Sequence, residues 1–127
     1  MSQWRGKIHG WYICAFAWSL IACANTETHL DGMDLQAWKE DPHGCKELRA
    51  AMIPALGEQR DKLLRLSEME IINLLGKPDE NELYVRSQQF YRYYLEPAPE
   101  CDPGKESPKV LVIRFNALGV SNEVSVE

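Results

Sequence analysis

Hydrophobic residues follow three different spacings along the chain, and each spacing predicts a different kind of structure. Residues 11–22 are almost continuously apolar. Residues 45–66 place leucine, isoleucine and methionine near the helical period, with interruptions at Pro54 and Gly57. This stretch predicts either a kinked helix or two shorter helices that meet near Pro54. From residue 83 onward the apolar period shortens toward two, which is typical of β-strands.

The clearest local signal predicts a helix over residues 68–75. Ser67 and Glu70 have the spacing of a capping box, in which each side chain bonds the backbone N–H of the other residue. Gly76 follows the last apolar residue, and Pro78 lies just beyond it. This pair is typical of a helix C-terminus. Both ends of this helix are therefore predicted from residue type alone.

Two other helix signals precede residues 68–75. Residues 34–40 predict one or two turns with Leu35 and Trp38 on the same side. Asp41 and Pro42 then resemble a helix start, with Asp41 as the N-cap and Pro42 at the first helical position.

Four strands are expected after the helices. They are residues 83–86, 89–95, 109–116 and 120–126. Gly119 suits the turn of the last hairpin, and on its second strand we expect Val120, Asn122, Val124 and Val126 to share a face. Helices followed by strands predict an α+β fold, with N-terminal helices packed on one face of a three- to four-stranded antiparallel sheet.

The N-terminal residues differ in composition from the rest of the 127-residue chain. Residues 1–22 contain Arg5 and Lys7 but no acidic residue, and the chain as a whole has 14 Lys and Arg against 19 Asp and Glu. A basic leader before a short apolar run is typical of a signal peptide. The apolar run itself is too short to span a bilayer. The alternative, a buried first helix, would need a larger fold to cover bulky residues on every side. We therefore expect a signal peptide at 1–22, a tether at 23–33 and one α+β domain at 34–127.

The end of the apolar run, Leu20-Ile21-Ala22-Cys23, resembles the lipobox of bacterial lipoproteins. That resemblance implies cleavage before Cys23, lipidation of its sulfur and acylation of its new amino group. Several acyl chains suffice for stable membrane anchoring. Ala24, rather than Asp, follows the cysteine, which by the same resemblance implies the outer membrane.

Two of the four cysteines remain after this assignment. Cys14 would leave with the signal peptide and Cys23 would be lipidated, so Cys45 and Cys101 are expected to form a disulfide in an exported domain. The alternative is a metal site that combines this pair with Asp41 and His43. It lacks the CxxC or HxxxH spacing of known sites, and we predict neither a metal nor a cofactor.

Residues 66–127 and the lipobox resemble the small outer-membrane lipoproteins of the SmpA/OmlA type. The matching positions are Ser67, Leu75, Gly76, Pro78, Phe115, Asn116, Gly119 and Val120. The resemblance implies an α+β domain of that family, whose members assist the insertion of β-barrel proteins into the outer membrane. Structurally related domains inhibit secreted hydrolases. The segment 38–66 and the pair of Cys45 and Cys101 depart from the family pattern.

Sequence signals for catalysis are weak. The chain lacks a Gly-rich phosphate loop, a Gly-x-Ser-x-Gly elbow, an HExxH motif and EF-hand spacing. His43 is the one histidine of the predicted domain, and a Cys/His enzyme would need a free thiolate at Cys45. A charge of −7 after residue 22, from 12 Lys and Arg against 19 Asp and Glu, disfavours nucleic-acid binding. We therefore expect a protein that is not an enzyme.

A binding role is predicted for one face of the sheet. The expected residues are Phe90, Arg92, Tyr94, Val110, Val112 and Arg114. Exposed aromatic residues and arginine suit a protein contact, although ordinary strand residues with solvated hydroxyls would give the same pattern. The sequence thus predicts a lipid-anchored scaffold that faces the periplasm and binds an envelope protein. The alternative is a periplasmic hydrolase inhibitor or a small ligand-binding domain on the same fold.

Overall fold

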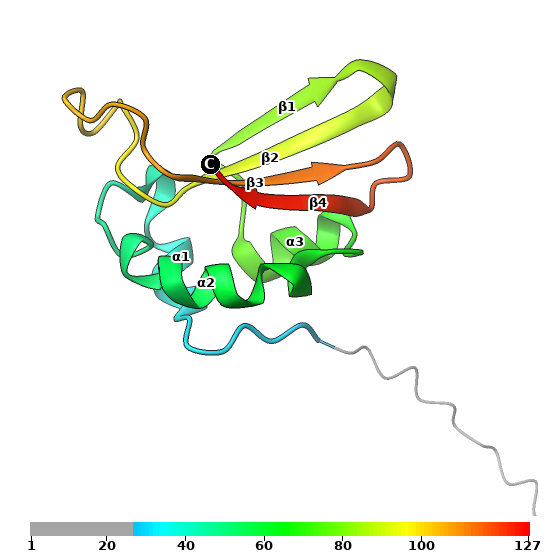
Figure 1. The fold of residues 1–127 in the computed structure, drawn as a ribbon, viewed down its shortest axis with the longest axis horizontal. Helices are drawn as coiled ribbons and strands as arrows, with labels where there is room; N and C mark the ends of the chain where they lie inside the picture. Colours follow the sequence, from blue (N-terminus) through cyan, green and yellow to red (C-terminus); the bar gives the residue numbers. More distant parts are fainter. Residues whose placement is uncertain (1–26) are drawn as a thin grey trace, which may run out of the picture.

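The computed structural model describes residues 27–127, in which three α-helices precede a four-stranded antiparallel sheet (Figure 1). The α-helices are α1 (Leu35–Lys39), α2 (Ile53–Gln59) and α3 (Glu68–Leu75), and the strands are β1 (Glu80–Tyr84), β2 (Gln88–Tyr94), β3 (Val110–Phe115) and β4 (Ser121–Val126). Four 3-10 segments are η1 (Pro42–Gly44), η2 (Ala50–Met52), η3 (Arg60–Leu63) and η4 (Val85–Ser87). The α+β class is confirmed. The predicted signal peptide and Cys23 lie outside the described residues.

Helix α3 forms as its sequence predicts. The Ser67 hydroxyl accepts from the Glu70 amide at 3.2 Å, and the Glu70 carboxylate accepts from the Ser67 amide at 2.7 Å. Gly76 ends the helix with φ of 80°, and its amide donates to the Ile72 carbonyl. Local residue types therefore fix both ends of α3 before any tertiary contact is considered.

The helical run before α3 consists of short pieces. Segment η2 ends at Met52 and α2 begins at Ile53, so the two meet directly before Pro54. Pro54 lies in the first turn of α2, where its missing N–H leaves no hydrogen bond unmade. Of the two alternatives predicted for this stretch, a kinked helix or two shorter helices, the structure has the second, with a 3-10 segment followed by an α-helix.

The predicted N-cap role of Asp41 is wrong. Pro42 does begin η1, but the Asp41 side chain makes no cap hydrogen bond there. Its two carboxylate oxygens instead accept from the amides of Lys46, at 2.7 Å, and Arg49, at 3.1 Å. Asp41 is fully buried, so it fixes the turn that follows η1 rather than starting a helix.

Strand β1 begins three residues earlier than the sequence predicts. Glu80 and Asn81 have low strand propensity and resemble a turn, but both pair with β2, at Arg92 and Tyr91. Val85 and Arg86, which the sequence places in the strand, belong to η4, where Arg86 has φ of 61°. Cross-strand pairing therefore overrides intrinsic propensity in this hairpin.

The four strands form a meander in which each strand pairs with its neighbours in sequence, in the order β1-β2-β3-β4. A register shift between Arg114 and Phe115 places Phe115 opposite Ser121 and Arg114 opposite Glu123. Asn122 is the extra residue of this bulge, and it is exposed, whereas Ser121 is buried. The prediction that Val120 and Asn122 share the face of the later valines is therefore wrong, because a bulge changes the alternation.

The buried side chains of helices and strands form one cluster. Its members are Leu30, Trp38, Met52, Leu56, Leu63, Ile71, Leu75, Tyr91, Tyr93, Leu95, Leu111, Ile113 and Phe115. In Figure 1 the three helices lie on one side of the sheet. The strand members of the cluster come from one face of β2 and β3, which leaves the other face of those strands outside this core.

Ser121 joins the start of β4 to the segment before α3. Its hydroxyl donates to the Leu63 carbonyl at 2.6 Å and accepts from the Leu66 amide at 3.0 Å. Its backbone carbonyl accepts from Arg65, and its amide donates to Leu66. Four hydrogen bonds thus connect residues more than fifty positions apart.

Candidate functional site

The open face, by which we mean the sheet face opposite the core, gathers the six predicted binding residues. They form three directly opposed pairs between β2 and β3: Phe90 with Arg114, Arg92 with Val112, and Tyr94 with Val110. Directly opposed residues of an antiparallel pair lie on the same face. The structure therefore brings the six residues together as adjacent rows.

Phe90 lies at the centre of the polar and aromatic contacts on the open face. The Arg92 and Arg114 guanidinium carbons lie 5.7 and 5.8 Å from its ring centroid. Tyr84 meets the same ring edge-on, with centroids 5.8 Å apart. Cation–π and edge-on aromatic contacts of this geometry are favourable. The phenyl ring is therefore held between two guanidinium groups and a second aromatic ring.

Acidic residues on the outer strands neutralise these arginines. Arg92 forms an ion pair with Glu82 at 2.5 Å, and Arg114 forms one with Glu123 at 3.4 Å. Arg114 also donates from two nitrogens to the Gln88 side-chain oxygen, at 2.6 and 3.1 Å. The open face thus carries local charge pairs and no large excess of one sign.

The six residues are not equally accessible. Val112 is only 6% exposed, whereas the other five are half-buried. The expectation that Val112 offers surface to a partner is therefore wrong. Val112 lies on the open face with the other five residues, but its side chain is almost fully buried.

Tyr94 is a hydrogen-bond donor on this face. Its hydroxyl donates to Glu80 Oε1 at 3.0 Å. Burial, together with this bond to a carboxylate, raises the pKa of Tyr94 to about 12. The phenol therefore stays neutral and able to donate at physiological pH.

The predicted disulfide is present. Cys45 and Cys101 are bonded across a sequence separation of 56, with their Cα atoms 5.7 Å apart. Their sulfurs therefore provide neither a thiolate nucleophile nor thiolate metal ligands. Within residues 27–127 no group of three or more His, Cys, Asp or Glu side chains could hold a metal ion.

A buried polar network that the sequence did not predict lies beside η1. Arg49 and Asp79 form an ion pair at 2.7 Å, with side chains 2% and 3% exposed. Asp79 also accepts from the amides of His43, at 3.0 Å, and Tyr94, at 2.8 Å. Two oppositely charged residues 30 positions apart carry no local signal of their pairing, which is why sequence analysis missed them.

The Arg49 guanidinium is also bonded to the backbone and stacked on an aromatic ring. Its Nε donates to the Trp38 carbonyl at 3.0 Å, and its Nη1 donates to the Tyr94 carbonyl at 3.2 Å. Its Cζ lies 4.7 Å from the Trp38 ring centroid. Arg49 therefore connects α1, β2 and the segment before β1 through a single side chain.

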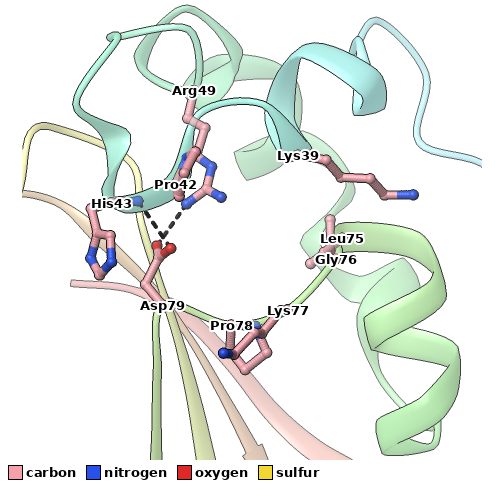
Figure 2. A pocket seen from close by; sticks show the side chains of 9 residues that line it. All are labelled: Lys39, Pro42, His43, Arg49, Leu75, Gly76, Lys77, Pro78 and Asp79. Atoms are coloured by element: carbon pink, nitrogen blue, oxygen red, sulfur yellow. Dashed lines mark hydrogen bonds and ion pairs between the residues drawn. The ribbon is translucent and has the colours of Figure 1, made fainter.

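A cavity adjoins this network. It has a volume of about 340 Å³ and lies between the Pro42–His43 segment and the turn that leads from α3 to β1 (Figure 2). The lining residues are Lys39, Pro42, His43, Arg49, Leu75, Gly76, Lys77, Pro78 and Asp79. The Nδ1 atom of His43 is buried without a hydrogen-bond partner in the described part of the chain.

Comparisons of the chain with protein-family models, with curated proteins and with solved structures gave no match. In residues 27–127, no helix is both long enough and apolar enough to cross a membrane.

Proposed function

We propose that this protein is a lipoprotein, anchored in the bacterial outer membrane through Cys23, whose domain is a non-catalytic protein-binding module of the SmpA/OmlA kind. Its helices would cover one sheet face and leave the open face toward a partner in the periplasm. The observation that carries the binding role is the cluster around Phe90. There, two arginines and an aromatic ring surround a half-buried phenyl ring on the sheet face that lies opposite the core of residues 27–127.

The residue types of this cluster suit a protein contact. Aromatic residues and arginine are enriched at the centres of protein interfaces and lose little conformational entropy when their side chains are already held. Arg92 and Arg114 are held by Glu82 and Glu123. A partner would therefore meet side chains that are already ordered.

The charge pattern limits the kind of partner. Because each open-face arginine has its own carboxylate, a strongly acidic partner gains little by displacing those carboxylates. The open-face side chains outside these ion pairs are aromatic or aliphatic, namely Tyr84, Phe90, Tyr94 and Val110. They suit an envelope protein that presents aromatic or aliphatic side chains.

Site-specific photo-crosslinking in the native cells tests this role. A photoreactive amino acid replaces Tyr84 or Tyr94 on the open face, or Glu58 on α2 as the matched exposed control. We expect adducts with an envelope protein from both open-face positions and none from position 58. Adducts from position 58 alone would contradict the assignment of the face. Adducts to a soluble hydrolase would instead favour the inhibitor alternative.

The anchor has a separate test. Cells are fed a fatty acid with an alkyne tag, and we expect the chain cleaved before Cys23 to carry the tag and to sediment with outer membranes. A Cys23→Ser variant should lose both properties, whereas a Cys14→Ser variant, changed within the proposed signal peptide, should retain both. Tagging of the Cys23→Ser variant would overturn the lipobox assignment.

A further inference from the structure

Exposed apolar side chains gather at one end of the sheet. All but one of the large exposed hydrophobic residues described belong to three neighbouring places: the end of β1 with the turn after it, the turn between β3 and β4, and the first turn of α3. Single exposed hydrophobic residues need no explanation, whereas a gathering of them marks a contact surface. The exposed residues are Leu48, Met69, Leu83, Tyr84, Val85 and Leu118, and Leu48 is the one that lies elsewhere.

The two hairpin turns lie at the same end of the sheet because the strands form a meander. Gln89, near the start of β2, pairs with Phe115, the last residue of β3. The start of α3 lies beside the second turn, since Ser67 forms a bridge with Val120. Figure 1 shows both turns on the right-hand side of the domain. The exposed side chains of these turns therefore face the same surroundings.

We define the apolar tip as Leu83, Val85 and Leu118. Their exposed fractions are 72%, 67% and 87%, so the domain itself buries little of them. Tyr84 is left out of this set because its ring packs edge-on against Phe90 on the open face. The apolar tip is thus distinct from the open face, although the two adjoin.

The first turn also presents a cation beside the apolar residues. Arg86 and Ser87 have φ of 61° and 59°, in the left-handed region where hairpin turns usually contain asparagine or glycine. Arg86 is exposed and forms no ion pair with any residue from 27 to 127. A long side chain with a charged end therefore follows Val85 directly.

The start of the described chain lies close to the same end. The carbonyl of His29 accepts from Lys62 Nζ at 3.2 Å. The next residue, Leu63, has its carbonyl bonded to the hydroxyl of Ser121, three residues after Leu118. In Figure 1 the described chain begins on the side toward which the two turns project. Residues 27–29 therefore connect to the domain near the apolar tip.

The chain between the proposed lipid anchor and the domain is short. Four peptide units separate Cys23 from residue 27, and they span at most about 14 Å when fully extended. This step rests on the proposed function, because it takes Cys23 as the lipid attachment point. The anchor then holds the end of the domain that carries the apolar tip next to the lipid headgroups.

We propose that the apolar tip enters the interfacial layer of the lipid bilayer. A bilayer contacts separate points on one side of a molecule, so the two turns need not touch each other. Apolar side chains at the acyl boundary leave water, and the guanidinium of Arg86 can reach the lipid phosphates. The strands then rise from the membrane, and the open face points along it toward an envelope protein in the same membrane.

Tryptophan fluorescence of the lipidated protein in phosphatidylcholine vesicles tests this insertion. Val85→Trp and Leu118→Trp each place a reporter in one turn. Leu48→Trp is the matched control, because Leu48 is also exposed but lies next to Arg49, which donates to Tyr94 at the far end of β2. We expect lipids brominated in their acyl chains to quench both tip reporters at least about twofold more than the control.

A charged substitution in one turn should weaken the insertion of the other. Val85→Asp in the Leu118→Trp chain should reduce quenching about twofold, because a carboxylate is costly in the bilayer. Leu48→Asp in the same chain should leave it unchanged. Trp38 is fully buried and gives the same background in every variant.

Sedimentation of the same vesicles separates the anchor from the apolar tip. A chain that carries no lipid and does not sediment with the vesicles would overturn the anchor, and this inference with it. A chain that sediments, but whose tip reporters are quenched no more than Leu48→Trp, would overturn the insertion alone. In that case, adducts from a photoreactive residue at position 118 in native cells would assign the tip to a protein partner instead.

Discussion

Ion pairs between arginine and a carboxylate occur in two very different settings in this domain. Arg49 and Asp79 pair at 2.7 Å with side chains 2% and 3% exposed, whereas Arg92 and Glu82 pair at 2.5 Å with side chains 29% and 52% exposed. The distances are similar, but the surroundings are not. Distance alone therefore says little about how much each pair contributes to stability.

The difference lies in what replaces a lost partner. Water can solvate Arg92 if Glu82 is removed, so an exposed pair is worth about 0.2–1 kcal/mol. Water has little access to Arg49, and Asp79 also holds two backbone amides. Removal of Asp79 would leave a buried charge and two partly buried amide donors without their partner.

The largest expected effect is that of Asp79→Ala. We predict a loss of about 5 kcal/mol in the free energy of unfolding, near the upper end for breaking a buried pair. Urea unfolding followed by far-UV circular dichroism measures it. Glu82→Ala is the matched control on the exposed pair, and a loss there as large as that for Asp79 would remove the distinction between the two settings.

The disulfide beside the buried network gives the next largest effect. The double variant Cys45→Ser/Cys101→Ser opens a loop closed across a sequence separation of 56. The chain-entropy model predicts a loss of about 4 kcal/mol. Thermal unfolding of the double variant, compared with the oxidised and reduced parent, measures this loss. An unchanged unfolding midpoint would show that the buried network holds this region without the covalent bond.

The exposed pair itself is expected to contribute far less. A double-mutant cycle with Arg92→Ala and Glu82→Ala should give a coupling energy of about 0.5 kcal/mol, which falls further in high salt because the pair is screened. Urea unfolding of the parent, the two single variants and the double variant at two salt concentrations gives this coupling energy. A coupling above about 2 kcal/mol would show that the open face is as strongly organised as the buried network.

The last expected effect concerns pH and Tyr94. Its pKa in the folded protein is raised to about 12 from the ordinary value of 10.0. The unfolded chain therefore loses this proton first, and the contribution to stability is present below pH 10 and is lost as the pH rises toward 12. Tyr94→Phe should flatten that part of the stability profile. Urea unfolding midpoints at pH 9 and pH 11 test this prediction. If the midpoint of Tyr94→Phe fell between these two pH values as much as that of the parent, Tyr94 would not be the source of the loss.

The elements that sequence analysis predicted correctly are those set by neighbouring residues. Ser67, Glu70 and Gly76 define α3 because a capping box and a glycine C-cap act within one turn. The pairing of β2 with β3 also follows from alternation, which is why the six open-face positions were found together.

The missed features depend on residues far apart in sequence. Glu80 and Asn81 form strand only because β2 lies beside them. The bulge at Asn122 places Ser121 opposite Phe115, and residue type alone gave no sign of it. Asp41 is a residue type that often caps helices. In the folded domain, however, its buried carboxylate accepts hydrogen bonds from the amides of Lys46 and Arg49 instead. The Arg49–Asp79 pair shows the same limit across 30 positions.

The hydrogen bonds of Ser121 have a consequence for the order in which the chain can fold during its synthesis. The carbonyl of Leu63 and the amides of Arg65 and Leu66 find their partners on a residue made more than fifty positions later. A nascent chain that has just completed α3 therefore carries these groups exposed to water. Only after β4 has left the ribosome can the helices and the sheet be joined at this point.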